Sequence, residues 1–394
     1  MAFIDELNLE GKTVLLRLDL NVPLKEGSIQ DDSRIQAALP TLEYLLQRAD
    51  KTVVCSHMGK PKGKRAPELS LEPVARRMSE LLGRNVELAP DCIGEEVRGR
   101  IRDMETGGIL LLENLRFHAG ETDNDPEFSR ELASLADVFI SDAFGVVHRA
   151  HASVTGVVEH IDTSAAGFLI QKEWRYLSKA LSNPDRPFVL IAGGAKVSSK
   201  LGLLYNLLDR VDRILIGGAM ASTFRKAEGY PVGNSLVEED LIAKAGEIMD
   251  KARNQGASFY LPVDYMMGPD PDQEKTYGVF PFQDIRSDAM ILDTGPATHT
   301  LFSETLKDAG TVVWNGPMGA FENPTYSQGS VGLAQTVGNV EAMTIAGGGD
   351  TDSLIHRCGM QDRIDFVSTG GGSFLELLEG KELPGLKALG IRME

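Results

Sequence analysis

Several basic side chains in the first half of the sequence follow short apolar runs, where a ligand site would be expected. They are Arg34 in DDSRI, His57 and Lys60 in SHMGKP, Arg116 in ENLRFH and Arg149 in HRAHAS. Loops that follow different strands of one sheet can converge on a single pocket. The planar fork of arginine suits phosphate and carboxylate groups. Each cation alone could be an ordinary surface charge, but together they predict a site for a small, highly charged anion.

The second half contains a different anion signal, the stretch AGGAKVSSK at residues 192–200. If a helix begins here, Lys196 and Lys200 are four residues apart and stack on one face near its N-terminus. The N-terminus of a helix attracts anions, so a glycine turn with two lysines suggests a phosphate. The stretch lacks the pattern G-x-x-x-x-G-K-[ST] and is therefore not a P-loop.

Glycine pairs or triples end nearly all the apolar runs of the second half, and glycine lets backbone N–H groups approach a phosphate closely. Such a cradle suits a nucleotide. In GGGDT, Asp350 follows one of these turns and could hold Mg²⁺, which uses one or two carboxylates plus phosphate oxygens. Aspartate is also favoured as a helix N-cap, which is the competing interpretation. Glu322, in WNGPMGAFE, could accept hydrogen bonds from ribose hydroxyl groups.

Other motifs predict less. HRAH, residues 148–151, has a spacing that metal ligands use, but a structural or phosphate-binding histidine is favoured because no third ligand lies nearby. Cys55 and His57 are too close along a strand to form a nucleophile pair. The dinucleotide fingerprint G-x-G-x-x-G with a later acid is missing, which disfavours a dehydrogenase.

Composition bounds the protein class. The chain has 394 residues, which favours two domains, and a net charge of −17, which argues against nucleic acid as a partner. Its three cysteines are scattered, so neither a disulfide framework nor a zinc site is expected. The sequence shows no signal peptide and no apolar run long enough for a membrane span, so we expect a cytoplasmic protein without a membrane partner.

A recurring unit must position these residues: an apolar run, an abrupt turn, then a helical pattern. Strands that alternate with helices predict an α/β fold with parallel sheets covered on both faces. A helical segment from Gly167, broken at Asn183-Pro184, predicts the boundary between two domains. The runs are TVLLRLDLNVP, KTVVCSHMGKP, GGILLLENLRFH and DVFISDAFG, then PFVLIAGGAK, RILIGGAM, TVVWNGPMG, MTIAGGGDT and DFVSTGGG.

In their order, the motifs closely resemble those of phosphoglycerate kinases over essentially the whole chain. The matching blocks are LRLDLNVP, DDSRI, SHMGKP, LLENLRFHAGE, DAFGVVHRAHAS, GGAKVSSK, WNGPMGAFE, GGGDT and STGGG with LELLEGKELPG. The resemblance implies two Rossmann-like domains joined by a hinge helix. It also implies Mg²⁺-dependent phosphoryl exchange between ATP and 3-phosphoglycerate, which gives ADP and 1,3-bisphosphoglycerate, in a monomeric enzyme.

The resemblance also implies where the ligands bind. Residues 1–168, with a returning tail at 380–394, would bind 3-phosphoglycerate, residues 169–186 would form the hinge, and residues 187–379 would bind the nucleotide. The substrate residues would be Asp19, Asn21, Arg34, His57, Lys60, Arg116 and Arg149. The nucleotide residues would be Gly194, Lys200, Gly218, Asn315, Pro317, Glu322, Gly348, Gly349, Asp350 and Thr351, with Asp350 on the metal. Arg34, Lys196 and Lys200 would be catalytic.

Three positions depart from the family pattern. Lys60 replaces an arginine that contacts substrate phosphate, which keeps the charge but loses the bidentate fork. Ser199 stands where an acid is common, and Phe374 changes the packing of a segment near the family's hinge. Two rival functions remain open at this point: a two-domain dehydrogenase, and a non-catalytic nucleotide-binding protein. Retention of Arg34, Lys196 and Lys200 argues against the second.

Overall fold

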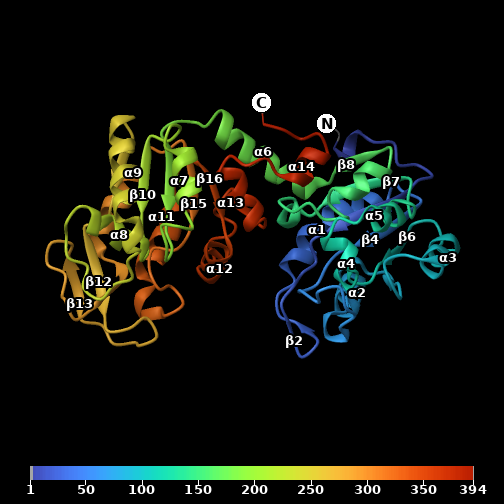
Figure 1. Ribbon diagram of the computed structural model, residues 1–394, viewed down its shortest axis with the longest axis horizontal. Coiled ribbons are helices and arrows are strands. Elements are labelled where there is room, and N and C mark those ends of the chain that lie inside the picture. The colour runs from blue at the N-terminus through green and yellow to red at the C-terminus, as the bar shows by residue number, and fades with distance from the viewer. Residues whose placement is uncertain (1–2, 394) are drawn as a thin grey trace. The chain divides into compact units, whose positions relative to one another are not determined.

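The computed structural model describes residues 3–393, and the chain divides into two compact units. The first comprises residues up to Arg175 together with Glu382 onward, and the second comprises Tyr176–Lys381. The boundary at Arg175 lies inside helix α6 (Phe168–Ser182), which ends directly before Asn183-Pro184. The helix expected from the sequence in this segment is present (Figure 1).

The first unit is built on a parallel sheet of six strands in the order β5-β6-β4-β1-β7-β8. The four runs predicted as strands in the first half are β1, β4, β6 and β7. A short hairpin, β2 (Leu24–Lys25) and β3 (Ser28–Ile29), follows β1. The sheet strands are β1 (Thr13–Leu18), β4 (Lys51–Cys55), β5 (Glu87–Leu88), β6 (Gly108–Leu111), β7 (Val138–Asp142) and β8 (Ser164–Ala166).

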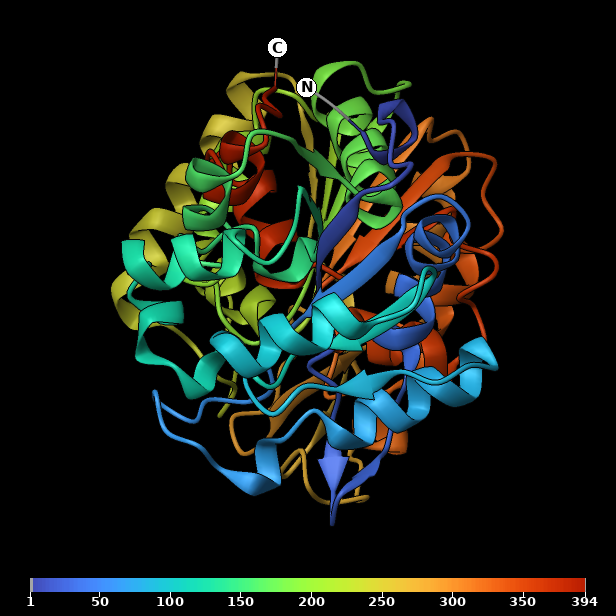
Figure 2. The same ribbon diagram turned by 90° about the vertical axis from the view of Figure 1, so that its right-hand side faces the viewer.

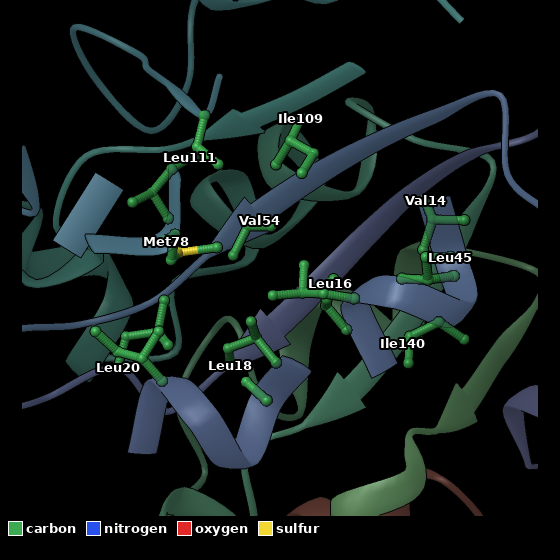
Figure 3. Close-up of a cluster of buried hydrophobic side chains, with 14 of the residues drawn as sticks. Val14, Leu16, Leu18, Leu20, Leu45, Val54, Met78, Ile109, Leu111 and Ile140 are labelled. Carbon is green, nitrogen blue, oxygen red and sulfur yellow. The ribbon is translucent and has the colours of Figure 1, made fainter. Parts of the chain in front are cut away.

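Both faces of this sheet are buried, because successive strand residues point to opposite sides and both sets are apolar. Figure 3 shows one face, where side chains of β1, β4, β6 and β7 meet Leu45 of α1 and Met78 of α2. Leu15, Val53 and Phe139 form the core of the other face. The helices of this unit are α1 (Ser33–Leu46), α2 (Glu72–Leu82), α3 (Glu95–Asp103), α4 (Ala119–Thr122), α5 (Pro126–Ala133) and α14 (Pro384–Ala388).

Helix α14 belongs to the first unit although it comes from the far end of the chain. Its Gly385 N–H donates to the carbonyl of Val147 at 2.8 Å, and a Cβ at Gly385 would lie 2.7 Å from Val154. Leu386 and Ile391 are buried. The segment is drawn in red in Figures 1 and 2. Close packing at a residue without a side chain therefore anchors the returning segment.

The second unit contains another parallel six-stranded sheet, in the order β11-β10-β9-β15-β16-β17. All five runs predicted as strands in the second half lie in it. Two parallel sheets flanked by helices confirm the predicted fold class. The strands are β9 (Phe188–Ala192), β10 (Arg213–Ile216), β11 (Ser258–Tyr260), β15 (Thr311–Asn315), β16 (Met343–Gly347) and β17 (Phe366–Ser368).

The second unit also carries an antiparallel sheet, β13-β12-β14, that the sequence analysis did not include. Its strands are β12 (Asp264–Gly268), β13 (Gly278–Pro281) and β14 (Met290–Thr294). The helices are α7 (Leu201–Leu207), α8 (Met220–Ala227), α9 (Ile242–Asn254), α10 (Pro296–Leu306), α11 (Gln328–Val337), α12 (Gly349–Arg357) and α13 (Gly372–Leu378). Within residues 3–393, no helix has the length and apolar character needed to cross a membrane.

Candidate active site

The loops after β1, β4 and β6 of the first unit meet at the backbone of Gly59. The Oδ1 atom of Asn21 accepts a hydrogen bond from Gly59 N–H at 2.9 Å, and Arg116 donates to the Gly59 carbonyl at 2.7 Å. Gly59 adopts a positive φ of 58°. The convergence of side chains from different strand ends is therefore observed within this unit.

Asp19, Arg34 and His57 form a second contact group in the same region. Arg34 is the second residue of α1 and binds the Asp19 carboxylate at 2.7 Å, with 37% of its side chain exposed. The Nδ1 atom of His57 lies 3.9 Å from Asp19. Among residues 3–393, Arg34 thus pairs with Asp19 alone, and its guanidinium is still open to solvent.

Arg149 and Lys60, the remaining predicted substrate residues, have fewer contacts with the cluster. Arg149 Nε donates to His148 at 3.1 Å, and its charge lowers the pKa values of both Arg116 and His57. Lys60 is exposed and makes no hydrogen bond or ion pair with any residue the structure describes. It follows Gly59 directly, so its amine is tethered beside the cluster but not held by it.

The cluster holds more positive charge than its neighbours compensate. Burial, followed by the charges of Arg149 and Arg17, lowers the pKa of Arg116 to about 10. The Nε of Arg116 is also buried without a hydrogen-bond partner in the described part of the chain. An anionic ligand is favoured here, because it would accept a hydrogen bond from the unpaired Nε–H of Arg116 and would also neutralise the excess positive charge.

A buried chain of polar groups lies among these side chains, and the sequence analysis missed it. Arg17, in β1, is fully buried; its Nε donates to Ser153 Oγ at 2.8 Å, and Ser153 donates to Glu121 at 2.7 Å. The Ser153 backbone N–H donates to the other Glu121 oxygen at 3.0 Å. The available signal was an arginine in the middle of the apolar strand TVLLRL. Because each member has a partner, the network can hold its geometry in a dry interior.

This network sets the protonation state of His57. Arg17 Nη2 lies 3.2 Å from His57 Nδ1, and a guanidinium can only donate, so Nδ1 must accept. Burial and the surrounding arginines hold the pKa of His57 well below its ordinary value. The ring is therefore neutral with its proton on Nε2, which leaves an N–H to donate to a ligand.

We expect acid to destabilise the protein partly through His151, whose pKa is lowered from 6.5 to about 4 by burial and by Arg116, Arg149 and Arg17. Below pH 6.5 the unfolded chain takes up a proton that the folded chain refuses, so stability is lost as the pH falls from 6.5 through 4. Between pH 7 and pH 5, His151→Gln should lose about 2 kcal/mol less unfolding free energy than the unchanged protein. Urea titrations at both pH values measure this, and equal losses in the two proteins would contradict it.

The second unit has its own candidate site, at the carboxyl ends of β9, β10, β15 and β16. Here the loops pack backbone against backbone: Gly194 N–H donates to Pro317 O, and Gly218 N–H donates to Met318 O, both at 2.9 Å. A Cβ at Gly193 would lie 2.2 Å from Pro317 O. Several of these glycines are therefore needed for contact between loops, in addition to any approach of a ligand.

Gly218→Ala should destabilise the second unit strongly. Gly218 has a φ of 68°, and an added Cβ would lie 2.4 Å from the Gly194 carbonyl oxygen. The left-handed backbone alone costs about 1–2 kcal/mol, and the clash with backbone adds to it. Gly229→Ala is a matched control, because Gly229 has a φ of 88° but nothing within 4 Å of its Cβ position. Urea unfolding measures both variants; equal stability would show that the loop contact contributes nothing.

Lys200 and Asn315 connect these loops at their base. Lys200 is only 8% exposed, and its Nζ donates to Asn315 Oδ1, while Asn315 Nδ2 donates to Gly347 O at 2.6 Å. Burial lowers the pKa of Lys200, and the charge of Asp350 raises it in part. Lys200 is thus a buried cation that is influenced by the charge of Asp350, which follows β16, two strands away from β9 in the sheet.

The expected stacking of Lys196 and Lys200 on one helix face is wrong. Helix α7 begins at Leu201, so both lysines lie in the preceding turn, with Lys196 exposed and Lys200 buried. Ser199 donates to the Lys196 carbonyl at 2.8 Å, and Ser198 is bound through its N–H by Glu238 at 3.0 Å. The hydrogen bonds of Ser198 and Ser199 stabilise the turn that precedes α7. Glu238, which binds Ser198, was not predicted from the sequence.

The GGGDT turn opens α12 as predicted, and it resolves the position of Asp350. Gly348 is the N-cap, with a φ of 101°, so Asp350 lies in the first turn and is not the cap. Its carboxylate is exposed and has no hydrogen bond or ion pair among residues 3–393. Thr351 is buried and accepts from Gly316 N–H at 2.8 Å. A free carboxylate beside open N–H groups at a helix start has the donors that a metal–phosphate complex would need.

Phe374 and Glu322, two further residues singled out from the sequence, differ in burial. Phe374 is fully buried in α13, and a Cβ at Gly347 would lie 2.7 Å from its ring, so it packs on the residue that ends β16 and begins GGGDT. Glu322 is exposed, and within residues 3–393 it makes no hydrogen bond or ion pair with the other predicted nucleotide-binding residues.

Comparison with known proteins identifies the family. The phosphoglycerate kinase family model matches residues 4–381. The chain belongs to the phosphoglycerate kinase family. The phosphoglycerate kinase of Maridesulfovibrio salexigens is 50% identical over 99% of both chains, and that of Geobacter sp. strain M21 is 51% identical over 99% of this chain and 98% of the relative.

Solved structures agree with this assignment. The phosphoglycerate kinase of Coxiella burnetii matches over 100% of both chains with a TM-score of 0.91 and 41% identity. The enzyme of Pyrococcus horikoshii OT3 matches over 99% of this chain and 98% of its own, with a TM-score of 0.85 and 32% identity. The protein is thus an enzyme with phosphoglycerate kinase activity, a kinase of glycolysis, which confirms the prediction and sets aside the dehydrogenase alternative.

Proposed function

We propose that the first unit binds 3-phosphoglycerate and that the second binds the nucleotide. The observation that carries the first assignment is the excess of positive charge around Arg116, whose Nε is buried and unpartnered. The second rests on the glycine loops that surround Lys200 and Asp350. The proposed substrate residues are Asp19, Asn21, Arg34, His57, Lys60, Arg116 and Arg149. The proposed nucleotide residues are Gly194, Lys200, Gly218, Asn315, Pro317, Glu322 and the turn 348–351.

The chemistry asks little of the first unit beyond charge and alignment. The acceptor is a carboxylate, already ionised at neutral pH, so no general base is required. This agrees with a neutral His57, which would donate its Nε2–H to the substrate. We assign Arg34 to the phosphoryl group in transfer, because its guanidinium is partly exposed and is held by Asp19.

In the second unit, Lys196 and Lys200 have separate roles. The exposed Lys196 would accompany Arg34 at the transferring group, and the buried Lys200 would hold the donor phosphates. Phosphoglycerate kinases use magnesium–ATP, and Asp350 fits as the ligand because its carboxylate is exposed and uncommitted. When bound, the ion would neutralise phosphate charge. The N–H groups at the start of α12 would bind phosphate oxygens, since a Cβ at Gly349 would meet nothing within 4 Å.

Ligands held by separate units react only when the units bring them together, so we include hinge-bending closure in the mechanism. Closure would also exclude water and so limit hydrolysis of ATP. A monomer and a cytoplasmic location complete the proposal, and both follow the resemblance to the family.

The experiment that tests this function is a coupled assay with ATP, Mg²⁺ and 3-phosphoglycerate. We expect ADP formation that requires all three components, and no change in protein fluorescence on titration with a nicotinamide cofactor. ADP formation without 3-phosphoglycerate would contradict the proposed acceptor.

Lys60→Arg tests the departure from the family pattern at this position. We expect the KM for 3-phosphoglycerate to fall or stay unchanged, because arginine supplies a bidentate fork where lysine supplies a point charge. Lys62→Arg, two residues on in the same loop, is the control and should leave KM unchanged. A clear rise in KM for Lys60→Arg would show that the lysine is the better residue here.

A further inference from the structure

A cysteine, a histidine and an aspartate meet in the first unit without a role in the proposed reaction. Asp91 and Cys92 lie in the loop after β5, and His118 follows the 3-10 helix Leu115–Phe117. One ligand atom from each, a carboxylate oxygen, Sγ and an imidazole nitrogen, lies within 4.8 Å of the others. Residues 26 and 27 positions apart in sequence thus bring three different metal-binding atoms close together.

The contacts within this cluster leave it accessible from one side. His118 Nε2 lies 2.5 Å from Asp91 Oδ1, and the two side chains are 29% and 46% exposed. Cys92 is fully buried beneath them, and its thiol donates to the Glu113 carbonyl at 3.0 Å. The His118 ring stacks on Phe128 at 5.0 Å, which restricts its plane. A cation would approach past the two exposed side chains and meet sulfur at the inner end.

The surroundings of His118 favour a cation. A hollow of 330 Å³ beside it is lined by four acidic residues, Asp123, Asp125, Glu127 and Glu131, together with apolar residues such as Ile93 and Phe128. Glu131 is paired with Arg98, Glu127 is paired with Arg130 at 3.7 Å and Asp125 caps α5, while Asp123 adds negative charge near the entrance.

We propose that Asp91, Cys92 and His118 form a binding site for a zinc-class divalent ion. Sulfur, imidazole nitrogen and carboxylate oxygen are ligands of Zn²⁺, which takes four in a tetrahedron, so one position remains for water. Mg²⁺ is disfavoured because it prefers oxygen ligands. Coordination replaces the Cys92 thiol proton, which leaves to solvent, and it replaces the hydrogen bond from the thiol to Glu113. The ion would tie the β5 loop to the segment that carries Arg116.

The test is a titration of the reduced, nucleotide-free full chain with Co²⁺, followed by Zn²⁺. We expect one equivalent of Co²⁺ to produce a thiolate-to-cobalt charge-transfer band, and Zn²⁺ to displace it. Cys92→Ser should lose the band; its hydroxyl can still donate to Glu113, which preserves the local structure. His118→Gln should weaken Co²⁺ binding by about tenfold or more.

Cys358→Ser is the matched control, because Cys358 is the less buried thiol, lies in the second unit and is outside the cluster. It should keep the band unchanged. The proposal is overturned if the unchanged protein gives no thiolate band, if Cys92→Ser keeps it, or if Cys358→Ser loses it. Should Cys92→Ser fail to fold, unaltered Co²⁺ affinity in His118→Gln would overturn the proposal alone. None of these readouts depends on kinase activity.

Discussion

Arg34→Ala should lower kcat about 10³-fold while leaving the protein folded, which is the size of effect seen for arginines that stabilise phosphoryl transfer. Arg34 stands in the first turn of α1, where the helix dipole disfavours a cation, so stability does not explain its presence. It forms an ion pair with Asp19, and its guanidinium is partly exposed. The loss should therefore appear in the chemical step and not in unfolding free energy.

The measurement is steady-state kinetics in both reaction directions, with urea unfolding of the same preparations. Arg48→Ala is the control: Arg48 follows the other end of α1 and stacks on Tyr44 at 4.0 Å. It should keep normal kcat. A near-normal kcat in Arg34→Ala would remove Arg34 from the phosphoryl group and leave it as a partner of Asp19 only.

Asp350→Ala should remove the gain in nucleotide affinity that magnesium provides. We expect the affinity measured in the presence of Mg²⁺ to fall by about 10–100-fold. The carboxylate is exposed and has no partner in the described chain, and its charge partly offsets the lowering of the Lys200 pKa by burial. Removing it leaves the cap of α12 intact, because Gly348 fills that position. The readout is calorimetric titration with ADP, with and without Mg²⁺.

Asp352→Ala is the matched control for this variant. Asp352 lies in the same first turn and pairs with His356 at 3.1 Å, so its removal changes the helix dipole interaction equally. It should leave nucleotide binding within about twofold of normal, because Asp352 carries the same charge in the same helix turn but is not the proposed metal ligand. Ordinary binding by Asp350→Ala would refute the metal assignment.

Much of this protein could be predicted because the informative residues lie at strand ends. A parallel strand buried on both faces reads as an apolar run, and the polar residues that end it are the ones at the ligand-binding edge. Asn21 and Arg116 illustrate this, since both reach Gly59 from different strands. The strand at Lys51–Cys55 and the helix start at Gly349 were predictable for the same reason.

The remainder depended on contacts between distant segments, which spacing does not encode. Lys196 and Lys200 suggested a helix, but the hydrogen bond from Ser199 to Lys196 belongs to a turn. The glycines of the second unit were explained by the approach of a ligand. Gly218 must also be glycine because a Cβ there would clash with the backbone of Gly194. Arg17 has no visible partner in sequence, because Ser153 and Glu121 lie more than a hundred residues away.

The return of the chain at Gly385 has a consequence for biosynthesis. The ribosome completes residues 1–175 long before it reaches Leu386 and Ile391, which that unit buries. Domains usually fold in order as they are synthesised, the N-terminal one first. Here the second unit has all its residues before the first does, so the unit translated first is the last to be complete, and until then the surface around Val147 and Val154 stays uncovered on the nascent chain.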